Sequence, residues 1–269
     1  MNKNLYTICA NAPKNYLYLP KELRRDNKYD YNYELDDSYN NSHSKSVKLI
    51  TKENSIILDV GCSTGIVGKY LINRKKCIVD GIELDAKAGK KAMEKGYRKV
   101  LNIDIDTRQG LKQLSELEQY DYILCLDVLE HIKNINELFL QLFLLLKSSG
   151  TMIISLPNIS HIDIIYHLLK GEFNYSPCGI LDNTHVRFFT KKSFLQWCHQ
   201  ILKDNNLKFK VEVVDNIPFN SLPIYSEIDT KYRDVIMKQI IKLSKKFLHK
   251  EAEEVLFTGQ YIFEVTKIN

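Results

Sequence analysis

The chain has 269 residues, 44% of them hydrophobic, which is enough to bury a full core in one large domain. Its formal net charge of +5 is too small a bias to indicate nucleic acid as a partner. The longest apolar stretch, residues 138–146, is much shorter than the roughly 20 residues of a membrane span, so no span is expected.

The spacing of the cysteines and the composition of residues 1–20 indicate the cellular location that we expect for the protein. Six cysteines form neither a C-x-x-C pair nor a zinc spacing, and they lie mostly in apolar runs, as reduced thiols do. Residues 1–20 contain no continuous apolar segment of the kind found in signal peptides. These observations predict a soluble cytoplasmic protein.

Residues 1–40 are polar and rich in tyrosine and asparagine. Such a segment is either a solvated N-terminal arm or a cap over a site, and the sequence leaves both open. A helical pattern starts near Ser42. We therefore divide the chain into an extension or cap at 1–40 and one domain at 41–269.

The stretch SIILDVGCSTGIVGKYL, residues 55–71, predicts a strand, a glycine turn and a helix. This is the first unit of an open α/β nucleotide-binding sheet. Gly61 permits a sharp turn and close approach of a ligand to the backbone, and Gly65 does the same at the start of the helix. The helix N-terminus then offers N–H groups to an anionic group.

Glycine spacing limits the choice of nucleotide. Gly61, Gly65 and Gly68 give G-x-x-x-G-x-x-G, with Ser63 where a dinucleotide loop has the glycine that admits the pyrophosphate. NAD is therefore disfavoured. An NTP-binding P-loop is excluded because G-K-[ST] is absent.

Acidic residues follow the next two predicted strands. Glu83 ends a strand at 77–83 and would accept hydrogen bonds from both ribose hydroxyls of a nucleoside, although an ordinary surface carboxylate is the alternative. Asp85 is expected to cap the helix at 86–95. Asp104 closes a strand at 98–103 and could accept from the adenine amine, or be a turn residue.

Strands and helices continue to alternate along the chain. The pattern predicts a helix at 111–117, strands at 120–126 and 151–156 around a helix at 138–146, and a strand at 211–214. An amphipathic helix at 232–248 and a long β pattern at 255–265 close the chain. This order predicts an α/β protein with a doubly wound, mostly parallel sheet.

Together these segments resemble a known family. ILDVGCSTG, GIELD, YDYILCLDVLEHI and LKSSGTMIISLPN have the order and spacing of class I S-adenosylmethionine (SAM) dependent methyltransferases. The segment LPNISHIDIIYHLLKGEFNYSPCGILDNTHVRFFT, residues 156–190, and YELDDSYNNSHSK, residues 33–45, are similar to a bacterial subgroup associated with glycosyltransferases and surface-polysaccharide biosynthesis. The resemblance spans about residues 33–269 and implies a seven-stranded Rossmann-like sheet whose last strand is antiparallel.

The resemblance also implies cofactor contacts. Asp59 and the loop 61–65, with Cys62 and Ser63, would hold the methionine end of SAM. Glu83 and Leu84 would lie at the ribose, Asp104 at the adenine amine, and Asp127 beside the methionine portion. Ser63 departs from the glycine that many relatives carry there.

Transfer to an acceptor hydroxyl benefits from a base, and histidine has a fitting pKa. Three histidines follow strand ends or lie in the inserted loop: His131, His161 and His185. His43 is a weaker candidate, and Arg187 could clamp a phosphate or carboxylate.

A divalent metal is the competing interpretation. If a helix began at Asp127, then Asp127, Glu130 and His131 would share one face, with His161 or His185 able to join. D-V-L-E-H also occurs in relatives without a metal, so we expect none.

The sequence thus predicts a SAM-dependent O-methyltransferase acting on a saccharide or saccharide-linked acceptor. The alternatives are a quinone-precursor or other small-molecule hydroxyl as acceptor, or a SAM-binding module without catalysis. The extension 1–40 and an insertion at 157–190 would form the acceptor pocket, and no nucleic acid is expected.

Overall fold

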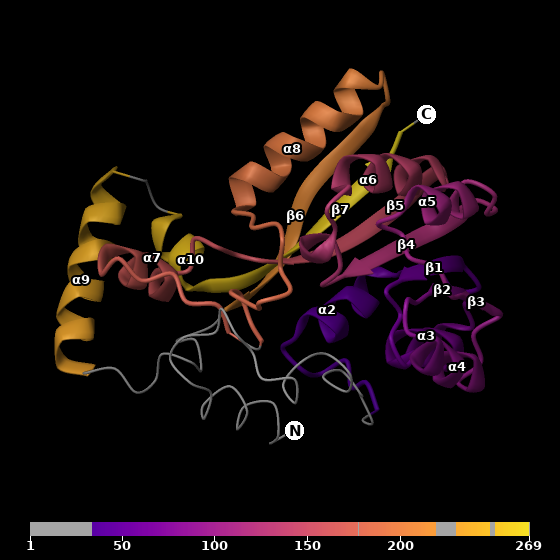
Figure 1. The fold of residues 1–269 in the computed structure, drawn as a ribbon, viewed down its shortest axis with the longest axis horizontal. Helices are drawn as coiled ribbons and strands as arrows, with labels where there is room; N and C mark the ends of the chain where they lie inside the picture. The colour runs from indigo at the N-terminus through magenta and orange to yellow at the C-terminus, as the bar shows by residue number, and fades with distance from the viewer. Residues whose placement is uncertain (1–33, 177, 219–229, 248–250, 269) are drawn as a thin grey trace.

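The structure is a computed structural model that describes residues 34–176, 178–218, 230–247 and 251–268. Its centre is a seven-stranded sheet with the order β3-β2-β1-β4-β5-β7-β6 (Figure 1). The strands are β1 Ile56–Val60, β2 Ile78–Ile82, β3 Lys99–Leu101, β4 Tyr120–Leu126, β5 Leu146–Pro157, β6 Phe209–Pro218 and β7 Thr258–Lys267. The first five strands are parallel, and β7 runs antiparallel to both β5 and β6. The predicted sheet, including its antiparallel last strand, is confirmed.

Helices cover both faces of the sheet, because successive strand residues point to opposite sides. In β1, Ile57 packs against the face covered by α2 (Ser42–Leu49), α3 (Ile66–Lys75) and α4 (Ala86–Glu94). Leu58 belongs to the other cluster, under α5 (Arg108–Leu114), α6 (Ile135–Leu144) and α8 (Lys191–Asp204). Both residues are fully buried, which places the core on both sides of β1 and β4.

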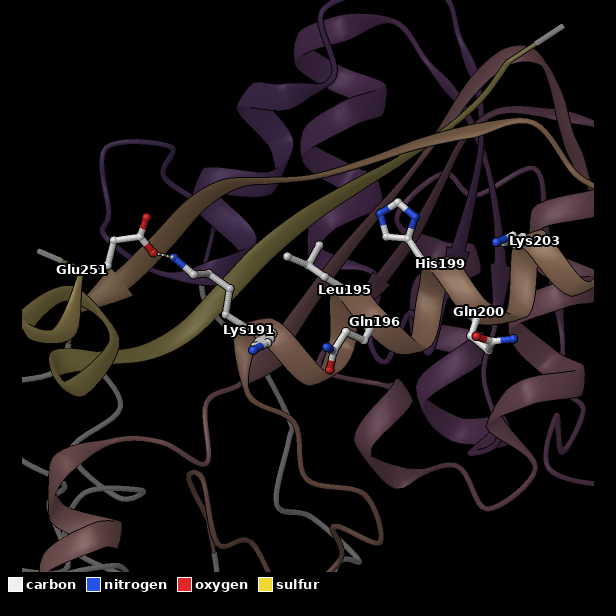
Figure 2. A pocket seen from close by; sticks show the side chains of 8 residues that line it. Lys191, Leu195, Gln196, His199, Gln200, Lys203 and Glu251 are labelled. Carbon is white, nitrogen blue, oxygen red and sulfur yellow. Dashed lines mark hydrogen bonds and ion pairs between the residues drawn. The ribbon is translucent and has the colours of Figure 1, made fainter. Parts of the chain in front are cut away.

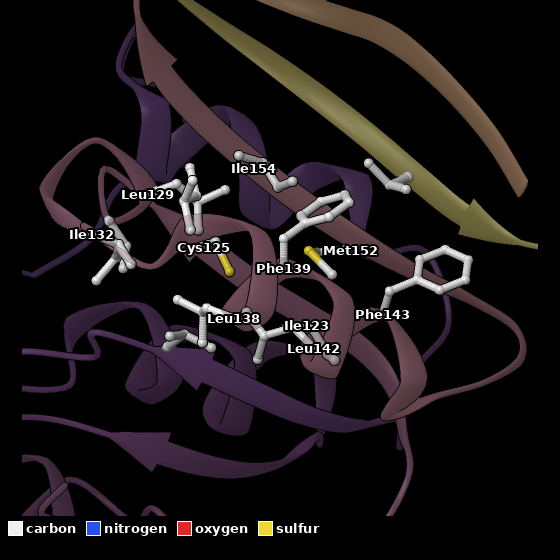
Figure 3. Packing of buried hydrophobic residues seen from close by; sticks show 14 of the residues in the cluster. Ile123, Cys125, Leu129, Ile132, Leu138, Phe139, Leu142, Phe143, Met152 and Ile154 are labelled. Carbon is white, nitrogen blue, oxygen red and sulfur yellow. The ribbon is translucent and has the colours of Figure 1, made fainter. Parts of the chain in front are cut away.

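The larger cluster is organised by α6. Phe139 projects from α6 toward Met152 and Ile154 of β5, and Phe143 lies further along the same helix, as Figure 3 shows. Burying one such side chain contributes roughly 2–3 kcal/mol, so this helix anchors the face of the sheet on which the turn after β4 rests.

Three helices form a separate layer near the carboxyl ends of the parallel strands. These are α7 (Ile162–Leu169), α9 (Thr230–Phe247) and α10 (Ala252–Phe257), on the left in Figure 1. Ile162 and Tyr166 of α7 pack with Met237 of α9 and Leu256 of α10. The insertion predicted at 157–190 therefore contains a helix with its own packing partners.

The predicted strand at 255–265 is wrong in its first three residues. Residues 255–257 belong to α10, and the strand begins at Thr258. The apolar run Val-Leu-Phe follows Ala252, Glu253 and Glu254, which favour a helix, and Leu256 turns inward onto the α7–α9 layer.

Other expectations have mixed outcomes. Residues 1–33 of the predicted cap lie outside the described residues. Cys62, Cys77, Cys125 and Cys198 are buried free thiols, whereas Cys178 is disulfide-bonded, which differs from the expectation of reduced cysteines throughout. Among the described helices, none has the length and apolar character that crossing a membrane requires.

Candidate active site

The glycine turn after β1 is shaped by three residues in the left-handed region. Gly61, Ser63 and Gly65 have φ angles of 70°, 49° and 78°. The N–H groups of Gly61 and Cys62 donate to the carbonyl of Ile82 at the end of β2. These bonds hold the turn between two strand ends, and α3 begins directly after it, as predicted.

Tyr97 explains the third glycine of the pattern. Its hydroxyl donates to Asp59 Oδ2 at 2.5 Å and accepts from the Gly68 N–H at 2.9 Å. A Cβ on Gly68 would lie 2.1 Å from the Tyr97 ring. Gly68 therefore makes room for the Tyr97 side chain. The role of Tyr97 could not be predicted from the sequence, because Tyr97 lies in the loop between α4 and β3, outside any periodic pattern.

Asp59 faces the interior. Its side chain is buried, and burial together with the charge of Glu83 raises the pKa of Asp59 to about 7, although the Tyr97 hydrogen bond opposes the shift. Through its hydrogen bond with Tyr97, the Asp59 carboxyl group thus supports the glycine turn from the buried side.

Glu83 and Leu84 follow β2 at the edge of the sheet. Glu83 Oε2 accepts from the Ser63 N–H and Oε1 from the Asp85 N–H, both at 2.8 Å. Leu84 is 62% exposed. Asp85 caps α4, as expected, by accepting from the N–H groups of Lys87 and Ala88.

Asp104 lies beyond the end of the neighbouring strand, β3. It is exposed, and its Oδ1 accepts from the Asp106 N–H at 3.0 Å. Because Ile82 pairs with Leu101, the ends of β2 and β3 lie side by side. Glu83 and Asp104 therefore follow adjacent strands at the same edge.

Asp127 does not begin a helix. Its φ is 57°, and the helical turn after it, η2, spans only Leu129–His131. The Asp127 carboxylate accepts from Ser155 Oγ at 2.5 Å, Gln260 Nε2 at 3.0 Å and Ser42 Oγ at 3.1 Å. The helix start at Asp127 on which the metal alternative depended is therefore absent, because the left-handed residue turns Asp127 toward α2, β5 and β7.

Glu130 is buried beside two histidines instead. The residue is 1% exposed, and within the described residues neither carboxylate oxygen has a hydrogen-bond partner. Burial, with the charges of Asp127 and Asp182, raises the pKa of Glu130 well above its ordinary value. Its main-chain carbonyl accepts from the N–H groups of Val186 and Arg187 at 2.8 and 3.0 Å, which ties the inserted loop to η2.

The two histidines beside Glu130 are His131 and His185. Their rings meet edge to face with centroids 4.8 Å apart. His185 Nε2 lies 4.0 Å from Glu130 Oε1. One potential ligand atom from each of the three residues lies within 4.8 Å of the others. We call Glu130, His131 and His185 the η2 cluster.

His161 and His43 have different surroundings. His161 is fully buried and caps α7, with its Nδ1 accepting from the Asp163 N–H at 3.3 Å. That contact favours a structural role over the predicted role as base. Burial lowers the pKa of His43 at the start of α2, against the opposing charge of Asp127.

Three aromatic side chains of the inserted loop pack together beside His185 of the η2 cluster. Phe173 meets Tyr175 and Phe188 edge to face, at 5.5 and 5.9 Å between centroids, and His185 lies 6.3 Å from Phe188. Phe173 is 41% exposed. The loop thus gathers aromatic rings next to His185.

A surface groove of about 860 Å³ lies elsewhere, along α8 (Figure 2). It is lined by Lys191, Lys192, Leu195, Gln196, His199, Gln200, Lys203 and Glu251. None of the site residues predicted from the sequence lines it, so the strand-end region remains the candidate active site.

Sequence comparison connects this geometry to known proteins. A family model described as a methyltransferase domain matches residues 31–201, more than half of the chain. The ubiquinone biosynthesis O-methyltransferase of Rickettsia typhi is 26% identical over 193 residues, which cover 70% of this chain and 75% of the relative. The protein of the same name from Glaesserella parasuis is 28% identical over 149 residues, covering 54% and 63%.

Structural comparison bears on the fold. A SAM dependent methyltransferase from Archaeoglobus fulgidus superposes with a TM-score of 0.51 at 18% identity, covering 86% of this chain and 97% of that one. The plantazolicin methyltransferase BamL, in complex with a triazolic desmethylPZN analog and SAH, gives 0.52 at 16% identity, with 85% of each chain covered. The chain therefore belongs to the methyltransferase domain family, and the predictions of a methyltransferase and of SAM as its cofactor are confirmed.

Proposed function

We propose that this enzyme transfers a methyl group from SAM to a hydroxyl oxygen of a small-molecule acceptor. The observation that carries the proposal is the η2 cluster, which places a buried carboxyl group and two imidazoles directly after β4. Ligands of open α/β sheets bind at the carboxyl ends of the strands, so this cluster lies where an acceptor would enter.

The strand ends fit a bound nucleoside. Glu83 is oriented by two main-chain N–H groups, and the exposed Leu84 beside it gives an apolar surface for an adenine ring. We assign Glu83 to the ribose hydroxyls and Asp104 to the adenine amine. The turn 61–65 and Asp127 would hold the methionine end, with Asp59 acting through Tyr97.

When bound, SAM supplies a methyl group on a sulfonium, which leaves as a neutral thioether. The chain has to align the acceptor oxygen with the S–CH₃ bond, exclude water and remove the hydroxyl proton. His185 Nδ1 lies 3.0 Å from the carbonyl of Ile180, a contact that places its proton on Nδ1 and a lone pair on Nε2. His185 Nε2 is therefore our first choice for the base, and His131, with Nδ1 at 3.2 Å from the Thr184 carbonyl, is the second.

Two acceptor classes are compatible with the aromatic loop. The names of the ubiquinone-biosynthesis relatives favour a phenolic hydroxyl of the quinone-precursor kind, one of the alternatives from the sequence. The saccharide-linked acceptor suggested by resemblance is the second candidate, because the rings of Phe173, Tyr175 and Phe188 would also stack on a sugar.

Methyl transfer from labelled SAM tests the proposal. The purified protein would be offered a library of phenols and a library of nucleotide sugars and glycans. We expect label on an oxygen of one phenol class, a loss of at least a hundredfold in turnover for His185→Ala, and unchanged SAM affinity. His199→Ala, in the α8 groove, is the matched control. SAM binding without turnover on either library would favour a SAM-binding module.

A further inference from the structure

We propose that Glu130, His131 and His185 form a binding site for a first-row divalent cation at the acceptor side of the active site. This deepens the proposed function, on which its catalytic role rests, and it departs from the sequence expectation of no metal. The argument starts from Glu130. Its buried carboxylate has two oxygens with no hydrogen-bond partner among the described residues, although buried polar groups are almost always satisfied.

Spacing of the potential ligands supports the assignment. A cation bound at about 2.1 Å separates ligand atoms by roughly 3 to 4 Å. Glu130 Oε1 and His185 Nε2 are 4.0 Å apart, and all three ligand atoms lie within 4.8 Å of one another. A small rotation of one side chain would therefore bring the set to coordination distance.

The outer contacts of the two rings are those of metal-binding histidines. Such histidines use one ring nitrogen for the metal and donate the other N–H to a carbonyl or carboxylate. His185 Nδ1 contacts the carbonyl of Ile180 at 3.0 Å, and His131 Nδ1 contacts that of Thr184 at 3.2 Å. Both contacts place the lone pair on Nε2, and for His185 this is the nitrogen nearest Glu130.

The backbone holds the three groups together. Glu130 and His131 are consecutive in η2, whereas His185 comes from the loop that donates two main-chain hydrogen bonds to the Glu130 carbonyl. Asp127 is not part of the set, because its carboxylate is bound to Ser42, Ser155 and Gln260. A site made by η2 and the inserted loop would exist whether or not SAM is bound.

Donor chemistry limits the choice of ion. Two imidazoles and one carboxylate suit Zn²⁺, Fe²⁺, Co²⁺, Ni²⁺ or Mn²⁺, whereas Ca²⁺ and Mg²⁺ prefer sites made wholly of oxygen ligands. Three protein ligands leave coordination positions open for an acceptor hydroxyl, as in catalytic metal sites. A bound ion would lower the pKa of that hydroxyl, whose proton would pass to water. An oxygen lone pair would then form the new O–CH₃ bond while the electrons of the S–CH₃ bond stayed on sulfur. The ion would then take over the activation of the acceptor hydroxyl from His185 Nε2.

Cobalt titration of the full-length protein tests the site directly. Co²⁺ bound by imidazoles absorbs visible light, so the spectrum reports binding without any acceptor. We expect one equivalent to bind to the wild type, and at least tenfold weaker binding for Glu130→Gln and for His185→Ala. His199→Ala, which removes a histidine of the α8 groove, should bind like the wild type. Equal binding by all four proteins, or no binding to the wild type, would overturn the site.

A second measurement separates this inference from the proposed function. Glu130→Gln keeps the size of the side chain, and its fold is checked by thermal melting and by SAM affinity, both of which should match the wild type. Added Co²⁺ should raise the Tm of the wild type but not that of Glu130→Gln. Cobalt binding without methyl transfer to any hydroxyl would remove the proposed function and leave the site. Methyl transfer that continues at full rate after chelation, with no cobalt binding, would remove the site alone.

Discussion

Gly68 and Tyr97 are 29 residues apart in the sequence and in direct contact in the structure. Gly68 lies inside α3, where glycine ordinarily costs about 1 kcal/mol relative to alanine. A methyl group at this position would collide with the Tyr97 ring, whose nearest atom is 2.1 Å from an ideal Cβ. Because Tyr97 is buried and bonded to Asp59, its ring has little freedom to move.

We expect Gly68→Ala to lower the free energy of unfolding by about 1–3 kcal/mol, because the collision exceeds the gain in helix propensity. Gly89→Ala in α4 is the control, since its new Cβ would approach the side chain of Val100 at 3.2 Å and that of Glu83 at 3.8 Å, without a collision. Urea unfolding of both variants measures the difference. A Gly68→Ala variant as stable as Gly89→Ala would show that Tyr97 does not constrain the helix.

Asp59 predicts a pH dependence of stability. In the folded protein its pKa is raised to about 7, whereas in the unfolded chain it is close to the ordinary aspartate value of about 4. Between about pH 4 and about pH 7, Asp59 is therefore protonated in the folded state but ionised in the unfolded state. Its contribution to the free energy of unfolding is fully present below about pH 4 and is lost as the pH rises through about 7.

Comparison with Asp59→Asn isolates this contribution, because other titrating groups are common to both proteins. From pH 5 to pH 8 the wild type should lose stability relative to the variant, by an amount on the order of a few kcal/mol. Urea unfolding at the two pH values measures it. A stability difference between the two proteins that stays constant with pH would contradict the raised pKa.

Among the elements, the junction between β5 and α7 connects the sheet to the layer of α7, α9 and α10. Asn158 is fully buried there, and its Nδ2 donates to the carbonyls of Val255 and Thr258 at 2.9 and 2.8 Å. Its Oδ1 accepts from the Ser160 N–H at 3.1 Å. One side chain thus ties the end of β5 to α10 and to the start of β7.

Asn158→Ala should destabilise the protein by about 2–4 kcal/mol, because buried carbonyl groups would lose their donors. Asn183→Ala, an exposed residue of the inserted loop, is the control and should change stability by less than about 0.5 kcal/mol. Thermal or urea unfolding measures both. Equal stability of the two variants would mean that the junction depends on packing alone.

Elements with strong periodicity were predictable. The strand at 120–126 was predicted with its observed bounds, and the unit of strand, glycine turn and helix at 55–71 was correct, because each buries a regular apolar pattern. The last three residues of α10, 255–257, were mistaken for the start of the final strand, since a three-residue apolar run has no period of its own. The left-handed backbone conformation of Asp127 could not be predicted from the sequence either, because it depends on contacts with Ser42, Ser155 and Gln260, which are far away in the chain.

For the whole molecule, the arrangement follows from the order of strands. In the sheet, β2 and then β3 follow β1 on one side, and β4 lies on its other side. The carboxyl ends of these strands therefore bring four features to one edge of the sheet: Glu83, Asp104, the 61–65 turn and the η2 cluster. The candidate site residues near the strand ends could therefore be predicted from the sequence. Which histidines approach Glu130 could not, because His185 reaches η2 through a loop whose path depends on main-chain hydrogen bonds.

Calorimetric titration of the wild type with SAM and with SAH tests the central claim, that a nucleoside is held at the ends of β1 and β2, most directly. The account predicts one site per chain, weakened roughly 10- to 100-fold by Glu83→Ala, which removes a charged hydrogen-bond acceptor. Glu94→Ala, an exposed carboxylate on α4, should bind like the wild type. No binding by the wild type, or equal affinity of the Glu83→Ala variant and the wild type, would contradict it.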